Sequence, residues 1–286
     1  MTEQFAKRKI NVRILANKGT KEERELFFQG LRCSYRGQMY SQQIQGTMTL
    51  SLWGMTLEQM DSLTIFGPIM QERRFNEITV SAGDDSGNMA LVYVGVIQQA
   101  YANMNTAPNV AFHISASSGA QDQVNIINGR SHEGGVDVAV ILADIAKEMG
   151  KTFENNGVSV ILRDRTYTGT ALTQAIEAAR DANININIDR EKPIIWPSDG
   201  SRSNEPVLIS PKTGLVGYPA FSGQGVMCTT LFNPEIACGR AVKIESSMKV
   251  ASGTWNPIAV FHHLESEIPN GAWFTQVFTY GKGLNQ

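Results

Sequence analysis

Apolar and polar residues alternate through much of residues 1–130, which predicts strands with one buried face. The apolar residues of Ile10–Leu15 and Thr47–Leu52 fall on every second position, the spacing at which side chains share one face of a strand. Three further segments have the same character: Glu77–Ala82, Ala90–Ile97 and Val110–Ser115. Gly83–Gly87 is rich in turn residues and predicts the turn between the first two of these. Lys21–Phe28 suits a short helix as well as a loop that leads into a strand. At least five strands without a convincing helix predict a barrel or a sandwich.

Near residue 135 a helical spacing replaces this alternation. Five apolar residues lie on one face of a helix: Val138, Ile141, Leu142, Ile145 and Met149. Gly150 follows them as a residue that ends a helix readily. A second helix is predicted at about Ala171–Ala182, with Thr170 as its N-cap. Short apolar segments predict strands between and after the helices: Val158–Leu162, Ile184–Ile188 and Pro193–Pro197. Together these elements predict a small α+β insert.

The polar and turn-rich stretch Ser198–Pro206 predicts a linker, and alternation returns beyond it. The predicted strands there are Val226–Phe232, Ala241–Ser246, Ile258–Leu264 and Trp273–Tyr280. A β-unit at each end of the chain, with a helical insert between them, predicts two related barrels. The predicted fold is therefore mainly β, with two β-barrel domains that flank a small α+β domain. The predicted boundaries are residues 1–130, 131–198 and 199–286.

Composition narrows the class of protein. The 286 residues are enough for about two domains. Charged residues make up only 18%, and 25 Lys and Arg stand against 27 Asp and Glu. This balance disfavours a nucleic-acid binder that relies on phosphate contacts. Between Arg74 and Arg130 there is no Lys or Arg, so the middle strands have a polar but nearly uncharged face. Such a face is either simply solvated or covered by neighbouring molecules.

Two further sequence features bear on where the protein is made. Uninterrupted apolar runs such as Val138–Ala143 are far shorter than the ~20 residues of a membrane helix, and the N-terminus has no apolar segment of a secretory signal. The three cysteines, Cys33, Cys228 and Cys238, do not form a disulfide framework, and there is no C-x-x-C. We therefore expect synthesis in a reducing cytosol.

The residues that commonly carry chemistry are scattered. Ser222–Gly225 resembles the start of a dinucleotide fingerprint but precedes a strand, so a tight turn is the better interpretation. His262 and His263 are adjacent on a predicted strand and point to opposite faces, which prevents them from sharing a metal. His132 and Glu133 are expected in a loop before the first helix. No nucleophile elbow, Walker loop or H-E-x-x-H motif is present. The sequence thus predicts no catalytic residue, no cofactor and no metal site.

A series of turn and strand segments marks the C-terminal part of the chain. In order, the series is Leu208–Pro211, Thr213–Pro219, Gly225–Phe232, Asn233–Ile236, Gly239–Ile244, Pro257–His263 and Trp273–Thr275. This series resembles the last domain of tail baseplate hub proteins of long-tailed phages and related injection machines, some of which are described as late control proteins. The preceding insert, with its paired helices and the strand Ile194–Pro197, is similar as well. The resemblance covers roughly residues 136–286.

The resemblance implies a structural virion protein rather than an enzyme. It implies a homotrimer at the tail tip in which each chain supplies two tube-like barrels, so that a ring with near-sixfold symmetry stacks on the tail tube while threefold symmetry remains for the spike. The implied partners are the tail tube protein, a separate central spike protein, other baseplate proteins and, transiently, phage DNA in the exit channel. The implied location is the virion, after synthesis in the host cytoplasm.

Turn and core residues are the candidate architectural positions. They are Gly214, Gly217, Tyr218, Pro219, Asn233, Pro234, Gly239, Trp255 and Trp273. Each of them fits a turn or a barrel interior equally well. Two other functions remain open: a hexameric tail tube initiator or distal tail ring protein, and a carbohydrate-binding or hydrolytic domain. The second of these predicts a concave apolar pocket with convergent polar groups.

Overall fold

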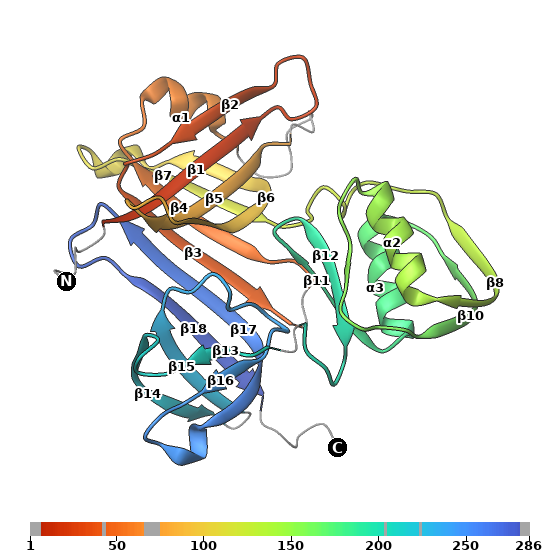
Figure 1. The fold of residues 1–286 in the computed structure, drawn as a ribbon. Helices are drawn as coiled ribbons and strands as arrows, with labels where there is room; N and C mark the ends of the chain where they lie inside the picture. Colours follow the sequence, from red (N-terminus) through yellow and green to blue (C-terminus); the bar gives the residue numbers. More distant parts are fainter. Residues whose placement is uncertain (1–6, 42–43, 66–74, 203–204, 223–224, 281–286) are drawn as a thin grey trace. The chain divides into compact units, whose positions relative to one another are not determined.

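The computed structural model describes residues 7–41, 44–65, 75–202, 205–222 and 225–280, coloured along the chain in Figure 1. These residues form two compact units, each built from separate stretches of chain. Unit 1 takes the described residues of 1–38, 47–118 and 261–274, and unit 2 takes those of 39–46, 119–260 and 275–286. The three-domain division proposed from the sequence stays a prediction.

Unit 1 is an antiparallel sheet with one short helix. Its elements are β1 (Arg8–Ala16), β2 (Arg24–Phe28), β3 (Cys33–Tyr40, whose last two residues belong to unit 2), β4 (Thr47–Trp53), α1 (Leu57–Leu63), β5 (Glu77–Asp84), β6 (Met89–Ala102), a 3₁₀ turn at Met104–Thr106 and β7 (Ala111–Ser117). The strand order is β3–β4–β7–β6–β5–β1–β2. Part of a C-terminal strand, residues Phe261–Ser266 of β17 (Gly253–Ser266), also belongs to this unit and lies next to β3.

The alternation of the sequence decides which face of this sheet is buried. Ile10, Val12 and Ile14 of β1 are buried, and each lies opposite a buried residue of β5. The predicted turn after β5 is present, and the Asp84 carboxylate accepts a hydrogen bond from the Ser86 amide at 2.9 Å. The ambiguous stretch before residue 28 becomes strand β2, which pairs with β1. Pairing with β1 supplies hydrogen-bond partners for the backbone of β2. The local sequence alone left the structure of this stretch undecided.

The expectation that the first 130 residues lack a helix is wrong. Thr56 caps the start of helix α1: its hydroxyl accepts a hydrogen bond from the Gln59 amide, while the Gln59 side chain accepts one from the Thr56 amide. This capping box is visible in the sequence as T-x-x-Q. Met60 and Leu63 are the buried residues of α1, and a face this small gives a weak periodic signal.

The first part of unit 2 combines two helices with short sheets. Its elements are β8 (Arg130–Asp137), α2 (Val138–Glu148), β9 (Glu154–Asn155), β10 (Ile161–Tyr167), α3 (Ala171–Asp181), β11 (Ile184–Asp189) and β12 (Lys192–Pro197). Strand β8 pairs with β10, while β11, β12 and β9 form a three-stranded sheet. Figure 1 shows α2 and α3 side by side next to β8 and β10. Four of the five apolar residues predicted to share a face of the first helix, Val138, Ile141, Leu142 and Ile145, form one buried cluster with alanines of α3, Tyr167 and Ile195.

Both predicted helices of this part are confirmed at their ends. The Thr170 hydroxyl accepts a hydrogen bond from the Thr173 amide at 3.2 Å, as an N-cap does. Gly150 follows α2 with φ +70°, a conformation that glycine adopts at little cost. His132 and Glu133, however, lie in strand β8 rather than in a loop, because pairing with β10 supplies the hydrogen bonds that this glycine-containing stretch lacks locally.

The second part of unit 2 is a β-structure. Its elements are β13 (Val207–Ile209), β14 (Leu215–Ser222), β15 (Gly225–Leu231), β16 (Val242–Ile244), a 3₁₀ turn at Lys249–Ala251, the first residues of β17 and most of β18 (Trp273–Tyr280). The strand order is β14–β15–β18–β17–β16–β13. A buried cluster containing Val226, Cys228 and Val277 fills its interior. Gly223 and Gln224, in the tight turn predicted between β14 and β15, lie outside the described residues.

Neither unit closes into the barrel that the sequence predicted. Among the described strands of unit 1, β2 pairs only with β1, and among those of unit 2, β14 pairs only with β15. Both sheets therefore have free edges. A repeat of two residues reports which face of a strand is buried, but an open and a closed sheet give the same repeat.

The predicted linker Ser198–Pro206 is anchored at Arg202. The Arg202 guanidinium donates two hydrogen bonds of 3.1 Å to one Asp189 carboxylate oxygen and another to the Cys238 carbonyl. The Arg202 amide also donates to the Gly239 carbonyl at 2.7 Å. All three partners lie more than ten residues away in the sequence, so local composition gave no sign of this anchor.

Gly239 lies where a side chain does not fit. It has φ +78°, and a Cβ atom built there would lie 2.5 Å from the Trp196 ring. Trp196 is one of the largest fully buried side chains. The absence of a side chain at residue 239 thus allows the indole to pack.

We predict that Gly239→Ala lowers the free energy of unfolding by about 2–4 kcal/mol, because left-handed strain adds to overpacking against Trp196. Gly217→Ala is the matched control, since Gly217 has φ +67° and nothing within 4 Å of a built Cβ, and strain alone costs about 1 kcal/mol. Denaturant unfolding of both variants measures the difference. Equal losses would show that the contact with Trp196 is unimportant.

Candidate functional site

The clearest candidate surface is the hairpin of β14 and β15 in unit 2. Four of the nine positions singled out from the sequence lie at or beside β14: Gly214, Gly217, Tyr218 and Pro219. The register shifts between Val216 and Ala220, so Gly217, Tyr218 and Pro219 form a β-bulge. Gly217 has φ +67° there, a conformation that a β-carbon disfavours. The bulge leaves Tyr218 72% exposed.

Exposed apolar side chains gather on this hairpin. We call them the hairpin surface: Val216, Tyr218, Phe221, Met227 and Leu231, all of them exposed. Between Lys212 and Glu235 the chain carries no charged residue. Soluble proteins usually protect a sheet edge with charges, proline or a covering segment. Apart from Pro219 in the bulge, β14 carries no charge or proline, and no other described strand pairs with its outer side. An exposed apolar edge of this kind is typical of an assembly contact.

The other five positions are structural. The Asn233 side chain accepts a hydrogen bond from the Glu235 amide at 2.9 Å, which fixes a turn, and the Pro234 carbonyl accepts one from the Arg190 guanidinium at 2.7 Å. Trp255 donates from Nε1 to the Ala251 carbonyl at 2.9 Å. Trp273 is buried in unit 1, and Gly239 makes room for Trp196. The structure therefore brings four of the nine residues together at or beside β14 and disperses the rest.

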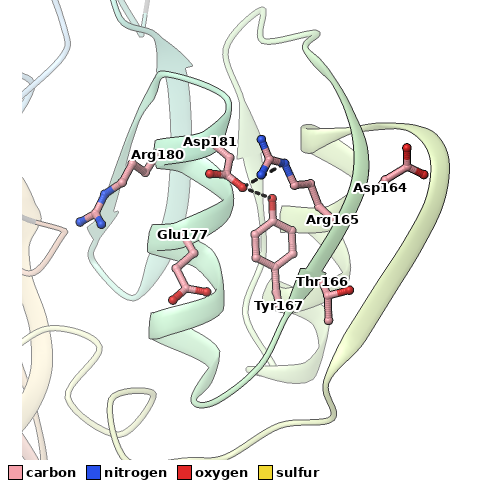
Figure 2. A pocket seen from close by; sticks show the side chains of 7 residues that line it. All are labelled: Asp164, Arg165, Thr166, Tyr167, Glu177, Arg180 and Asp181. Atoms are coloured by element: carbon pink, nitrogen blue, oxygen red, sulfur yellow. Dashed lines mark hydrogen bonds and ion pairs between the residues drawn. The ribbon is translucent and has the colours of Figure 1, made fainter.

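A separate pocket lies in unit 2, between β10 and α3, with a volume of about 380 Å³. Figure 2 shows its lining residues: Asp164, Arg165, Thr166, Tyr167, Glu177, Arg180 and Asp181. All of them are polar or charged apart from the tyrosine ring. A carbohydrate-binding or hydrolytic site was expected to be apolar with a few polar groups, and this pocket has the opposite character.

The contacts of the pocket join the strand to the helix. The Tyr167 hydroxyl donates to the Asp181 carboxylate at 3.0 Å, and the Arg165 Nε lies 3.4 Å from the same carboxylate oxygen (Figure 2). Burial and, to a smaller extent, the hydrogen bond to Asp181 raise the pKa of Tyr167 to about 12. A carboxylate that is already paired in this way is a poor general base, so the arrangement fits a structural role for Asp181.

We predict that Tyr167 ionises near pH 12, later than an unperturbed tyrosine at about 10. Because its pKa is raised in the folded protein, its contribution to stability is complete below about pH 10 and disappears as the pH rises towards 12. The difference between alkaline absorbance titrations of the wild type and Tyr167→Phe reports this one residue. Circular dichroism over the same range shows whether unfolding coincides with ionisation. A difference curve centred near pH 10 would contradict the burial argument.

Other chemical groups give no competing site. Within the described ranges, no cluster of three or more His, Cys, Asp and Glu side chains could hold a metal ion. Cys33, Cys228 and Cys238 are buried free thiols. Burial raises the pKa of all three, to about 11 for Cys228. In the same part of the chain, no helix has the length and apolar character required to cross a membrane.

The sequence analysis missed two features of unit 2. The exposed hairpin surface could have been predicted from the uncharged stretch between Lys212 and Glu235. The second feature is a buried ion cluster in which Lys151 pairs with both Asp122 and Glu191. These three residues are far apart in the chain, so no sequence spacing links them.

Comparison with known proteins identifies solved structures with a similar fold and a matching family. No curated protein sequence matches the chain. A tail protein from Neisseria meningitidis MC58 is similar with a TM-score of 0.62 and 7% identity, over 96% of this chain and 97% of that one. The 43 kDa tail protein of prophage MuSo2 from Shewanella oneidensis has a TM-score of 0.56 and 10% identity, over 94% and 97% of the two chains.

A type VI secretion component, the E. coli c3393 protein, is similar with a TM-score of 0.57 and 10% identity, over 94% of this chain and 77% of that one. It is described as structurally similar to the T4 bacteriophage tail proteins gp27 and gp5. Identities this low establish a shared fold. The family model described as baseplate hub gp41 matches residues 10–266, nearly the whole β-rich chain, and the protein therefore belongs to the baseplate hub gp41 family of phage tail proteins.

Proposed function

We propose that this protein is the trimeric hub of a phage tail baseplate, which joins the sixfold tail tube to the threefold central spike and lines the channel through which DNA leaves. Family membership supports the baseplate location. The two β-rich units of each chain support the adaptor role, since three chains then supply six such units to one ring. The location is the virion, after synthesis in the host cytoplasm.

The observation that carries this proposal is the exposed hairpin surface. Its apolar side chains lie beside a free sheet edge in a stretch without charge. Obligate interfaces between subunits are more apolar than ordinary protein surface and are depleted in charged residues at their centre. A monomer in solution would leave this surface in water, whereas a ring of subunits covers it.

The proposed partners follow from this arrangement. The ring stacks on the tail tube protein on one side and on the spike protein on the other, other baseplate proteins surround it, and phage DNA contacts it transiently. Function then depends on shape and edge pairing, without catalysis. The polar pocket beside Tyr167 has its carboxylate engaged in a structural contact, which agrees with that role.

We expect the purified full-length protein to have a mass close to three times 31.4 kDa, measured by native mass spectrometry and light scattering. Six copies would instead favour the tail tube initiator or distal tail ring. A monomer at all concentrations would contradict the proposed self-assembly.

Tyr218→Lys is expected to weaken assembly at least about tenfold, because it places a charge in an apolar contact. The matched control is Val250→Lys, since Val250 is 81% exposed in the same unit and lies outside the hairpin surface. Sedimentation over a concentration series measures association, and thermal unfolding checks that both variants remain folded. Equal association of the two variants would exclude Tyr218 from the interface.

A further inference from the structure

One lysine joins three separate segments of unit 2. The Lys151 ammonium pairs with the Asp122 carboxylate and with the Glu191 carboxylate. The three side chains are only 12%, 4% and 20% exposed. Lys151 follows helix α2, Asp122 lies in the turn before β8, and Glu191 lies in the turn between β11 and β12. Burial acts to lower the pKa of Lys151, but the two carboxylates outweigh it and hold this pKa above its usual value.

Glu191 also holds the start of the Gly119–Val260 stretch, where the chain enters unit 2 from unit 1. Its second carboxylate oxygen accepts a hydrogen bond from the Gly119 amide at 2.9 Å. Gly119 also lies close to the hairpin of β11 and β12, because a Cβ atom built on it would be 2.6 Å from the Ile188 side chain of β11. Helix α3 contacts the turn that contains Asp122, since the Leu172 amide donates to the Asp122 carbonyl at 3.3 Å.

A second entry into unit 2, at residues 39–41 and 44–46, contacts the hairpin of β11 and β12. The Ile188 amide donates to the Ile44 carbonyl at 2.7 Å, and the Asn187 side chain donates to the Tyr40 carbonyl at 3.2 Å. Two of the three stretches of chain that enter unit 2 from unit 1 are thus held by β11 and the turn that follows it. The ion cluster lies at that turn, so we expect its loss to loosen the contacts of both stretches.

The charges of the cluster make it sensitive to the loss of one group. It contains one cation and two carboxylates, so removing the cation leaves two neighbouring buried carboxylates without a counterion. A buried charge that loses its partner is strongly destabilising, whereas replacing a whole buried ion group with neutral residues is often harmless. The nearby pair of Lys192 and Glu154 is more exposed, at 38% and 33%, and exposed pairs contribute little.

We propose that Lys151 is an ionic latch that holds the Gly119–Asn125 turn and the β11–β12 hairpin together, so that breaking it opens these segments as one local unit while the pairing of β1 with β5 and the core around β15 stay intact. The latch is a conformational device independent of the oligomeric state. Local opening of this kind occurs in cooperative segments whose free energy lies below that of global unfolding.

Native-state hydrogen exchange of the full-length protein tests the latch residue by residue. In Lys151→Met we expect the Gly119 and Ile188 amides to exchange about tenfold faster or more. Amides paired between β1 and β5, and those of the β15 core, should keep their wild-type rates. The control Lys192→Met, which removes the more exposed pair on the same hairpin, should leave the Gly119 and Ile188 amides within about twofold of the wild type.

A rescue variant separates the charge effect from lost packing. In the triple variant Lys151→Met, Asp122→Asn and Glu191→Gln no buried charge lacks a partner, so exchange at Ile188 should return towards the wild-type rate. If Lys151→Met does not fold, Glu191→Gln alone tests the idea, because it weakens the contact with Gly119 and should accelerate exchange there. Wild-type exchange at Gly119 and Ile188 in the single variants, or equal acceleration in the β1–β5 pair, would overturn the proposal.

Discussion

Each strand of this protein must bury one face and pair its backbone on both sides, and most of the structure follows from this double requirement. The first demand is met by apolar residues at every second position, as in β1 and β5. The second is met inside the sheets but not at their edges, where β2 and β14 each pair with one described strand. At β14 the edge also carries exposed apolar side chains. An edge of this composition is a ready template for pairing with another chain.

The charged residues of unit 2 join segments that the sheets do not connect. Lys151 links a turn to a hairpin, Arg202 ties a polar stretch to Asp189, and Asp181 links α3 to the β10 tyrosine. The chain has few charges for its length, and many of those in unit 2 have partners far away in the sequence. Side chains that could serve catalysis in another protein are used here for architecture, which agrees with membership of a structural tail family.

The solved tail proteins and the secretion component share this fold at 7–10% identity. Alternation explains how so little identity suffices, because a strand requires an apolar residue at a position and not a particular one. A particular residue is required only where the backbone conformation or close packing excludes the others. Gly239 beneath the Trp196 ring is such a position.

The sequence by itself determined the local elements and the general class of the protein. Helices α2 and α3 were predictable because Gly150 and Thr170 mark helix ends and the apolar spacing is regular, and β1 was predictable because its alternation is strict. The series of turns near Tyr218 was enough to suggest the hub family. Tertiary structure alone decided that the sheets stay open, that residues 261–274 return to unit 1, and that β2 and β8 become strands. It also decided the partners of Lys151 and Arg202. These features depend on contacts between residues distant in the chain. A periodic pattern indicates only the local secondary structure and which face of it is buried.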